Sequence, residues 1–155
     1  MALWIGLGIA VAVVGALFVL AGVSRSGKAP GLVDGRLSPC PDKPNCVSSE
    51  APADDARHHI EPLVAVGHDL PKLWAAARAA VEAFGGTVIQ DDGASYLAAE
   101  FKSSWFGFVD DLELRLDRDR MRLHVRSASR VGHSDLGANR SRAQQLLRSI
   151  EERLR

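Results

Sequence analysis

Residues 111–126, DLELRLDRDRMRLHVR, hold two runs in which apolar residues alternate with polar and charged ones. The apolar positions are Leu112, Leu114, Leu116, Met121, Leu123 and Val125. Alternation with a period of two is typical of strands that bury one face. The charged residues 117–120 between the runs predict a tight turn. We therefore expect an antiparallel pair in which Leu116 lies opposite Met121 and all six apolar side chains face one core.

Two amphipathic helices are expected on either side of this pair. Residues 69–84 carry apolar side chains on one stripe, and Gly85-Gly86 can end that helix. Residues 136–154 carry a second stripe that starts at Leu136. Candidate N-caps are Asp69 for the first helix and Ser134 or Asp135 for the second.

A second hairpin completes the predicted sheet. Residues 87–90 and 96–102 alternate around a turn signature at 91–93, while residues 60–66 form a short strand weakened by a proline. The predicted fold is α+β: an antiparallel sheet of about four strands flanked by two helices on one face, in the order helix, four strands, helix.

The amino-terminal segment predicts a membrane anchor. Residues 2–23 carry no charged side chain and are long enough to cross a hydrocarbon core. A cleaved signal peptide is the alternative, but the segment lacks a basic start. We therefore expect three parts: an anchor at 2–23 whose partner is the lipid bilayer, a linker with a cysteine-containing loop at 24–56, and a globular domain at 57–155.

The two cysteines help to predict on which side of the membrane the domain lies. Cys40 and Cys46 lie in a proline-rich loop, where a disulfide, free thiols, and a metal or redox site are the alternatives. Arg25 and Lys28 after the anchor favour a cytoplasmic domain by the positive-inside rule. A disulfide favours an oxidising compartment. We expect a single-pass protein of the inner membrane, with its domain in the periplasm.

The net charge and the placement of the histidines limit the kinds of partner that we expect. Lys and Arg together number 19, as do Asp and Glu, so the net charge is zero and nucleic-acid binding is not expected. His58 and His59 are adjacent and are interpreted as loop residues rather than metal ligands. No cofactor and no metal site are predicted.

Small polar residues gather where the last strand should end and the last helix begin. The candidate binding residues are Asp110, Ser127, Ser129, Arg130, Asp135, Asn139 and Arg142. The predicted register places Asp110 opposite Ser127, and the helix start can receive an anion on its free amides. The structural alternative is that these side chains only cap the helix and tie down the loop.

A catalytic triad of Ser127, His133 and Asp135 is not favoured. These residues are near neighbours in sequence, which rarely gives triad geometry, and no Gly-x-Ser-x-Gly elbow is present.

An aromatic loop joins two of the predicted strands. Residues 103–108, SSWFGF, bring three aromatic side chains together beside a glycine. They form a plug at the edge of the core, a partner-binding patch or a membrane-facing contact. We expect the core plug.

Two motifs give the chain a family resemblance. They are Cys40-Pro-x-x-Pro-Asn-Cys46-Val47-Ser48-Ser49, and Ser127-x-Ser129-Arg130-x-Gly132-x-Ser134-Asp135-x-Gly137-x-Asn139-x-x-Arg142, with a strand near Asp110-Asp111 between them. From about residue 37 to the carboxyl end the chain resembles the domain of unknown function family numbered 1499. The resemblance implies a small bacterial or plastid protein, often exported or anchored, with no established reaction.

The functional prediction follows from a polar cluster that lacks catalytic geometry. We expect a non-enzymatic binding or envelope-associated module that holds a protein partner or a small anion. The alternative is an enzyme that uses a polar pocket around Asp110, Ser127, Ser129 and Asp135.

Overall fold

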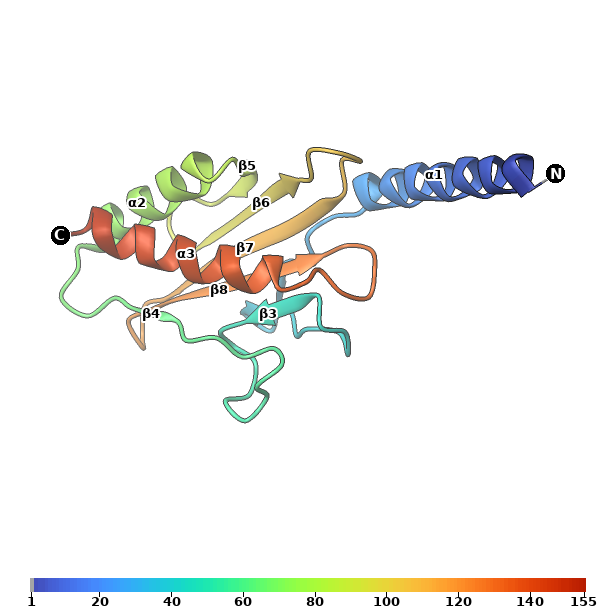
Figure 1. The fold of residues 1–155 in the computed structure, drawn as a ribbon. Coiled ribbons are helices and arrows are strands. Elements are labelled where there is room, and N and C mark those ends of the chain that lie inside the picture. The colour runs from blue at the N-terminus through green and yellow to red at the C-terminus, as the bar shows by residue number, and fades with distance from the viewer. Residues whose placement is uncertain (1) are drawn as a thin grey trace.

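The fold was obtained as a computed structural model that describes residues 2–155, with side chains from residue 4 onward. A long amino-terminal helix, α1 (Ala2–Ser26), projects from an α+β domain (Figure 1). A two-stranded ribbon, β1 (Leu32–Val33) and β2 (Arg36–Leu37), follows it.

The main sheet has six strands, all antiparallel to their neighbours. They are β3 (Cys46–Ser48), β4 (Leu63–Val64), β5 (Thr87–Asp91), β6 (Tyr96–Lys102), β7 (Val109–Asp117) and β8 (Arg122–Ser129). Their order is β3-β8-β7-β6-β5, and β4 pairs with another part of β8. The α+β class is confirmed, whereas a sheet of about four strands is wrong. Strands as short as β3 and β4 carry little periodicity, and they form because β8 offers them its free edge.

The register of the central hairpin differs from the prediction by two residues. Leu116 lies opposite Leu123 rather than Met121, and Asp110 lies opposite Ser129 rather than Ser127. The turn is longer than expected because Met121 adopts a positive φ of 50° and belongs to it. A slip of two residues leaves every side chain on its predicted face, so the predicted core face is correct.

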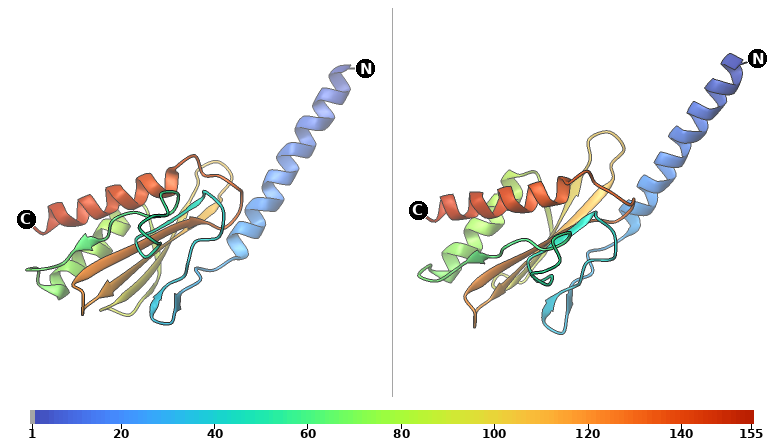
Figure 2. Two further views of the ribbon diagram at one scale, coloured as in Figure 1. Left: turned by 90° about the horizontal axis from the view of Figure 1, so that it is seen from below. Right: turned by 60° about the horizontal axis from the view of Figure 1, so that its bottom comes forward.

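Helices α2 (Leu70–Ala83) and α3 (Ala138–Arg153) cover one face of this sheet (Figures 1 and 2). The core between the two layers includes Leu73, Trp74, Val81, Leu97, Leu112, Leu114, Leu123, Val125, Leu146 and Ile150. Asp69 caps α2 as predicted, because its Oδ1 accepts the Lys72 N–H at 2.8 Å. The prediction that Leu136 starts the last helix is wrong: α3 begins only after Gly137, and Leu136 is fully exposed to solvent.

The opposite face of the sheet is covered by the segment between α1 and β3. The β1–β2 ribbon lies on the side of the sheet away from the helices (Figure 2). Leu37 packs there against Tyr96 and Ala98. The segment 24–56, expected as a linker with a cysteine-containing loop, contains the strands β1, β2 and β3.

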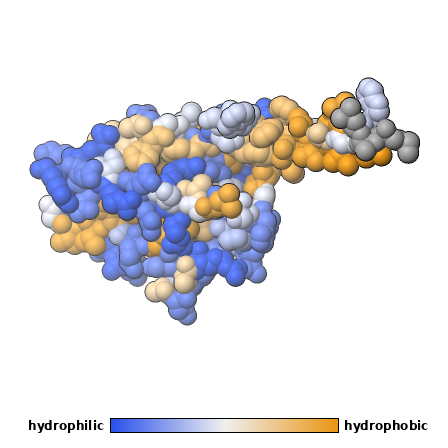
Figure 3. Space-filling view, in the orientation of Figure 1, coloured by the Kyte–Doolittle hydropathy of each residue, from blue (hydrophilic) through white to orange (hydrophobic). Residues whose placement is uncertain are grey.

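Helix α1 has an exposed part and an attached part. Its side chains from Trp4 onward are largely exposed and apolar, and its length and composition would allow it to cross a membrane, as would those of a signal sequence (Figure 3). Ala21 and Ser24 near its end are fully buried against the domain. The Ser24 hydroxyl accepts the Val109 N–H at 2.8 Å, which joins α1 to the start of β7.

Candidate functional site

The candidate site is the corner where β7 begins, β8 ends and α3 starts. Asp110 and Ser129 are directly paired across β7 and β8. Ser127 lies one step further along the same face of β8, because side chains two residues apart share a face. The long β7–β8 ladder positions these side chains, and the first turn of α3 lies beside them.

Asn139 is the centre of a buried network at this corner. Its Oδ1 accepts the Ser127 hydroxyl at 2.6 Å, and its Nδ2 donates to Ser129 Oγ at 2.9 Å. The same Nδ2 donates to the Asn45 carbonyl at 3.1 Å, in the loop just before β3. One fully buried side chain therefore links α3, β8 and the cysteine loop.

Arg142 neutralises the carboxylate of Asp110. Its Nη2 donates to Asp110 Oδ2 at 2.8 Å and its Nη1 to Asn139 Oδ1 at 2.8 Å. Its guanidinium also lies 4.6 Å from the centroid of the Phe101 ring, a cation–π arrangement. The Arg142 guanidinium is therefore already paired with groups of the protein itself.

Asp135 accepts hydrogen bonds from the backbone at the start of α3. Its Oδ2 accepts the Asn139 N–H at 2.6 Å and its Oδ1 accepts the Gly137 N–H at 3.1 Å. Gly137 itself has a φ of 83°, a conformation that favours glycine. The helix start therefore already holds a carboxylate of its own chain, where the sequence suggested room for an external anion.

Arg130 lies on the other face of the sheet. Its Nε and Nη2 donate to Asp111 at 2.9 and 2.6 Å, and Nη2 also donates to Glu100 at 2.8 Å. The hydrogen bond with Asp111 raises the pKa of the guanidinium above its ordinary value. Arg130 Nη1 donates to the Ser24 carbonyl at 3.1 Å, so it fastens α1 to the sheet. Six of the seven predicted residues thus converge at one corner, and Arg130 does not.

A cavity of about 360 Å³ adjoins the corner. Its apolar walls include Leu17 and Leu20 of α1 together with Phe108 and Val131. Its polar lining includes Asp110, Ser129, Ser134 and Asp135. The cavity therefore offers apolar contact beside carboxylate oxygens, which accept hydrogen bonds or receive a cation.

Ser127, His133 and Asp135 do not come together as a catalytic triad. The Ser127 hydroxyl donates to Asn139, and His133 is exposed on the loop rather than among the residues that line the cavity.

A serine–histidine contact occurs instead on the opposite face of the sheet. Ser49 Oγ lies 3.1 Å from His124 Nδ1, and both residues are buried. Burial lowers the pKa of His124, which favours its neutral form. Ser49 Oγ also accepts the Val125 N–H at 2.9 Å, which ties the end of β3 to β8. No pattern in the sequence indicates this pair, although Ser49 belongs to the cysteine-loop motif.

A layer of buried charge beneath the linker was also missed. Glu113 is fully buried and accepts hydrogen bonds from Tyr96 Oη at 2.7 Å, Arg126 Nη1 at 3.0 Å and the Gly31 N–H at 2.9 Å. Burial and the bond to Glu113 raise the pKa of Tyr96 well above its usual range. The alternating pattern predicted these side chains on the outer face correctly, but it contained no signal that a distant segment would cover them.

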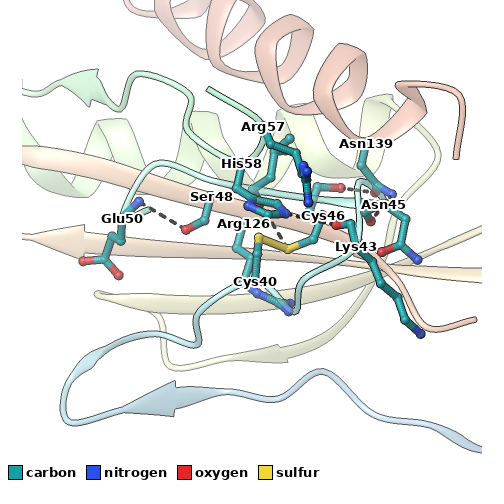
Figure 4. The surroundings of a disulfide bond; sticks show 12 residues. Cys40, Lys43, Asn45, Cys46, Ser48, Glu50, Arg57, His58, Arg126 and Asn139 are labelled. Atoms are coloured by element: carbon teal, nitrogen blue, oxygen red, sulfur yellow. Dashed lines mark hydrogen bonds between the residues drawn. A yellow bond between two sulfur atoms is a disulfide. The ribbon is translucent and has the colours of Figure 1, made fainter. Parts of the chain in front are cut away.

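Cys40 and Cys46 form a disulfide, which is one of the three alternatives that the sequence left open (Figure 4). Beside it, His58 Nδ1 lies 2.7 Å from Asp55 Oδ2, and His58 Nε2 lies 3.0 Å from the Lys43 carbonyl. The bridge therefore belongs to a folded loop, and free cysteines are absent from the part of the chain that the structure describes. Within residues 4–155, His, Cys, Asp and Glu side chains do not form a group of three that could hold a metal ion.

The fold and the site together define a disulfide-containing α+β domain that carries an exposed, apolar amino-terminal helix. The chain belongs to the family described as protein of unknown function (DUF1499), whose sequence profile matches residues 36–150. The matched part includes both cysteines and every residue of the polar corner. A comparison with curated proteins finds no match.

Proposed function

We propose that this protein is a single-pass membrane-anchored module that binds a partner and performs no chemistry of its own. Helix α1 supports the anchor, because its 25 residues give a length of about 37 Å against a hydrocarbon core of about 30 Å. Its exposed side chains are apolar along nearly its whole length, which a helix in water would not favour.

The disulfide supports placing the domain on the outer side of an inner membrane. Such bonds persist in oxidising compartments and are rare in the cytosol. The basic residues in the last turn of α1 and after it favour the opposite orientation, but Arg25 Nη2 donates to the Phe106 carbonyl and Arg36 pairs with Glu50. We give the covalent bond the greater weight.

The cavity between α1 and the polar corner is the observation that carries the binding role. Apolar walls and a carboxylate-bearing lining suit a partner with an apolar body and an end that donates hydrogen bonds or carries positive charge. The side chains of the corner are engaged with one another, which favours binding over catalysis. An amphiphile that reaches the cavity from the membrane has this chemistry.

Thiol labelling of intact cells tests the orientation. A membrane-impermeant thiol reagent should leave the wild type unlabelled until it is reduced. It should label the partly exposed Cys40 of a Cys46→Ser variant from outside. Labelling that appears only after lysis, without any reductant, would place the domain in the cytoplasm.

Filling the cavity tests the binding role. Ala138 lines the cavity, and Ala138→Trp would occupy it, whereas Gln145→Trp places the same bulk on an exposed face of α3. Native mass spectrometry of the detergent-purified full chain should show a bound amphiphile on the wild type and on Gln145→Trp, and none on Ala138→Trp. The binding role is wrong if the wild type carries no such species, or if all three proteins carry it equally.

A further inference from the structure

We propose that the domain is seated on the bilayer by two loops, 103–108 and 130–137, which insert Trp105 and Leu136 at the headgroup boundary. This rests on the proposed function, because it requires α1 to span the same bilayer. The occupant of this surface is therefore the lipid around α1 rather than a second protein.

The two loops lie beside the attached end of α1 (Figures 1 and 2). In the first loop, the Phe106 ring meets the Phe18 ring edge to face, with centroids 5.8 Å apart. In the second loop, Val131 lines the cavity together with Leu17 and Leu20 of α1. The first loop thus contacts α1, and the second faces the same turns of α1 across the cavity.

Each loop also presents one large apolar side chain to solvent. Trp105 is 91% exposed and Leu136 is 97% exposed, more than any large apolar residue of α1 from Trp4 onward. Leu136 is held there in a strained conformation with a φ of 54°. The expected core plug is therefore wrong for Trp105. Two neighbouring loops that expose a tryptophan and a leucine at one end of a domain are typical of a binding surface.

The length of α1 sets the depth of these loops. A spanning helix needs about 20 apolar residues, so a span that begins near Ala2 ends near Ala21. Phe106 already contacts Phe18, and Val131 lines a cavity together with Leu17 and Leu20. These three residues of α1 lie within that span. The loops must therefore reach the hydrocarbon boundary, where tryptophan is enriched in membrane proteins.

The charges around this end are compatible with a lipid surface. Arg25 lies in the last turn of α1 and Lys28 follows the helix. Lys102 precedes the first loop, pairs with Glu100 and has a side chain that is more than half exposed. Basic residues at this level attract anionic headgroups.

Fluorescence of single-tryptophan variants in proteoliposomes tests the proposal. The chain has three tryptophans, Trp4, Trp74 and Trp105, so Trp4→Phe with Trp74→Phe leaves Trp105 as the reporter. The full chain is reconstituted in phosphatidylcholine and phosphatidylglycerol, with or without lipids brominated near the headgroup. Trp105 should lose fluorescence by about twofold with the brominated lipids, because indole rings at the boundary lie within reach of the bromines.

Further variants provide the second position and the control. In a background without the three native tryptophans, Leu136→Trp should be quenched as Trp105 is. Val66→Trp should not be quenched, since Val66 is exposed but follows β4, which pairs with β8 near the β7–β8 turn, far from the start of β7 where α1 attaches. If removal of the buried Trp74 unfolds the domain, Trp4→Phe is compared with the Trp4→Phe, Trp105→Phe pair, and the difference reports Trp105.

A variant that keeps only Trp4 separates the two proposals. If Trp4 is quenched while positions 105 and 136 respond only to aqueous iodide, α1 is inserted and the seating of the loops is wrong. If positions 105 and 136 are shielded from iodide without lipid quenching, a protein covers them and the lipid proposal is also wrong. If Trp4 itself remains accessible to iodide, the membrane anchor fails.

Discussion

Asn139 shows how much of the corner depends on one side chain. Its amide accepts one hydrogen bond from Ser127 and donates to Ser129 and to the Asn45 carbonyl, and it is fully buried. Asn139→Ala would remove these three hydrogen bonds from a dry environment, at a cost of about 2–4 kcal/mol in the free energy of unfolding. Urea denaturation measures this loss. Gln145→Ala on the exposed face of α3 should change stability by less than about 0.5 kcal/mol, and an equally small effect of Asn139→Ala would contradict the role of the network.

Asp117 should make the free energy of unfolding depend on pH in the acidic range. The Arg120 amide, and then the Arg115 guanidinium, hold the pKa of Asp117 at about 2, below its ordinary value of 3.8. A lowered folded-state pKa stabilises the protein above pH 3.8, and that contribution is lost as the pH falls from about 4 to about 2. The wild type should exceed Asp117→Asn by about 2 kcal/mol at pH 6 and lose most of this advantage near pH 2. Denaturant titrations at the two pH values measure this difference in stability between the wild type and Asp117→Asn. A difference that stays constant would contradict the role of Asp117.

At the scale of elements, the short strands depend on contacts distant in sequence. Strand β3 has three residues, and its Cys46 pairs with Ala128 on β8 while also forming the bridge to Cys40. The disulfide closes a loop with a sequence separation of 6, which restricts the unfolded chain. Tertiary pairing and the covalent bond together stabilise a strand that has little propensity of its own.

Removing the disulfide should therefore destabilise the domain without changing its sheet. The double variant Cys40→Ser, Cys46→Ser should lose about 2 kcal/mol in the free energy of unfolding, the loop-entropy value for so short a loop. Dithiothreitol should lower the stability of the wild type to a similar degree and leave the double variant unchanged. If the reductant destabilised both proteins equally, its effect would not come from this bond.

At the scale of the whole molecule, α1 is attached to the domain at its carboxyl end. The buried Ser24 hydroxyl accepts the Val109 N–H and donates to the Val109 carbonyl, and the Ser24 carbonyl accepts from Arg130. This attachment allows the loops to be held at a set level along the helix. A flexible tether would leave that level undefined.

Ser24→Ala should loosen this attachment. The substitution leaves the buried Val109 N–H without its partner, which should lower the free energy of unfolding by about 1–3 kcal/mol in detergent micelles. Ser26→Ala is the matched control, since Ser26 is exposed and its hydroxyl bonds only locally, to the Val23 carbonyl. Equal stabilities for the two variants would mean that α1 is attached by other contacts.

Sequence patterns succeeded where a structure depends on neighbours along the chain. The two long strands, the hairpin before them and the Asp69 cap of α2 follow from alternation, turn residues and helical stripes. The register failed by two residues because it depends on the backbone conformation of Met121, which no pattern encodes. The corner residues follow from the composition of the sequence. Their pairing does not, because Asp110 pairs with Arg142 on one face of the sheet and Asp111 pairs with Arg130 on the other.

The amino-acid sequence by itself determined the apolar amino-terminal helix, the α+β class, the core face of the central hairpin and the group of polar residues at its end. These features arise from local periodicity and from hydrophobic burial, which short segments already express. Only the tertiary structure decided that a linker buries the charged face of the sheet, that Asn139 joins three segments, and that Trp105 and Leu136 are exposed beside α1. Those outcomes require segments far apart in the chain to exclude water from one another, and such long-range pairing leaves no periodic trace in sequence.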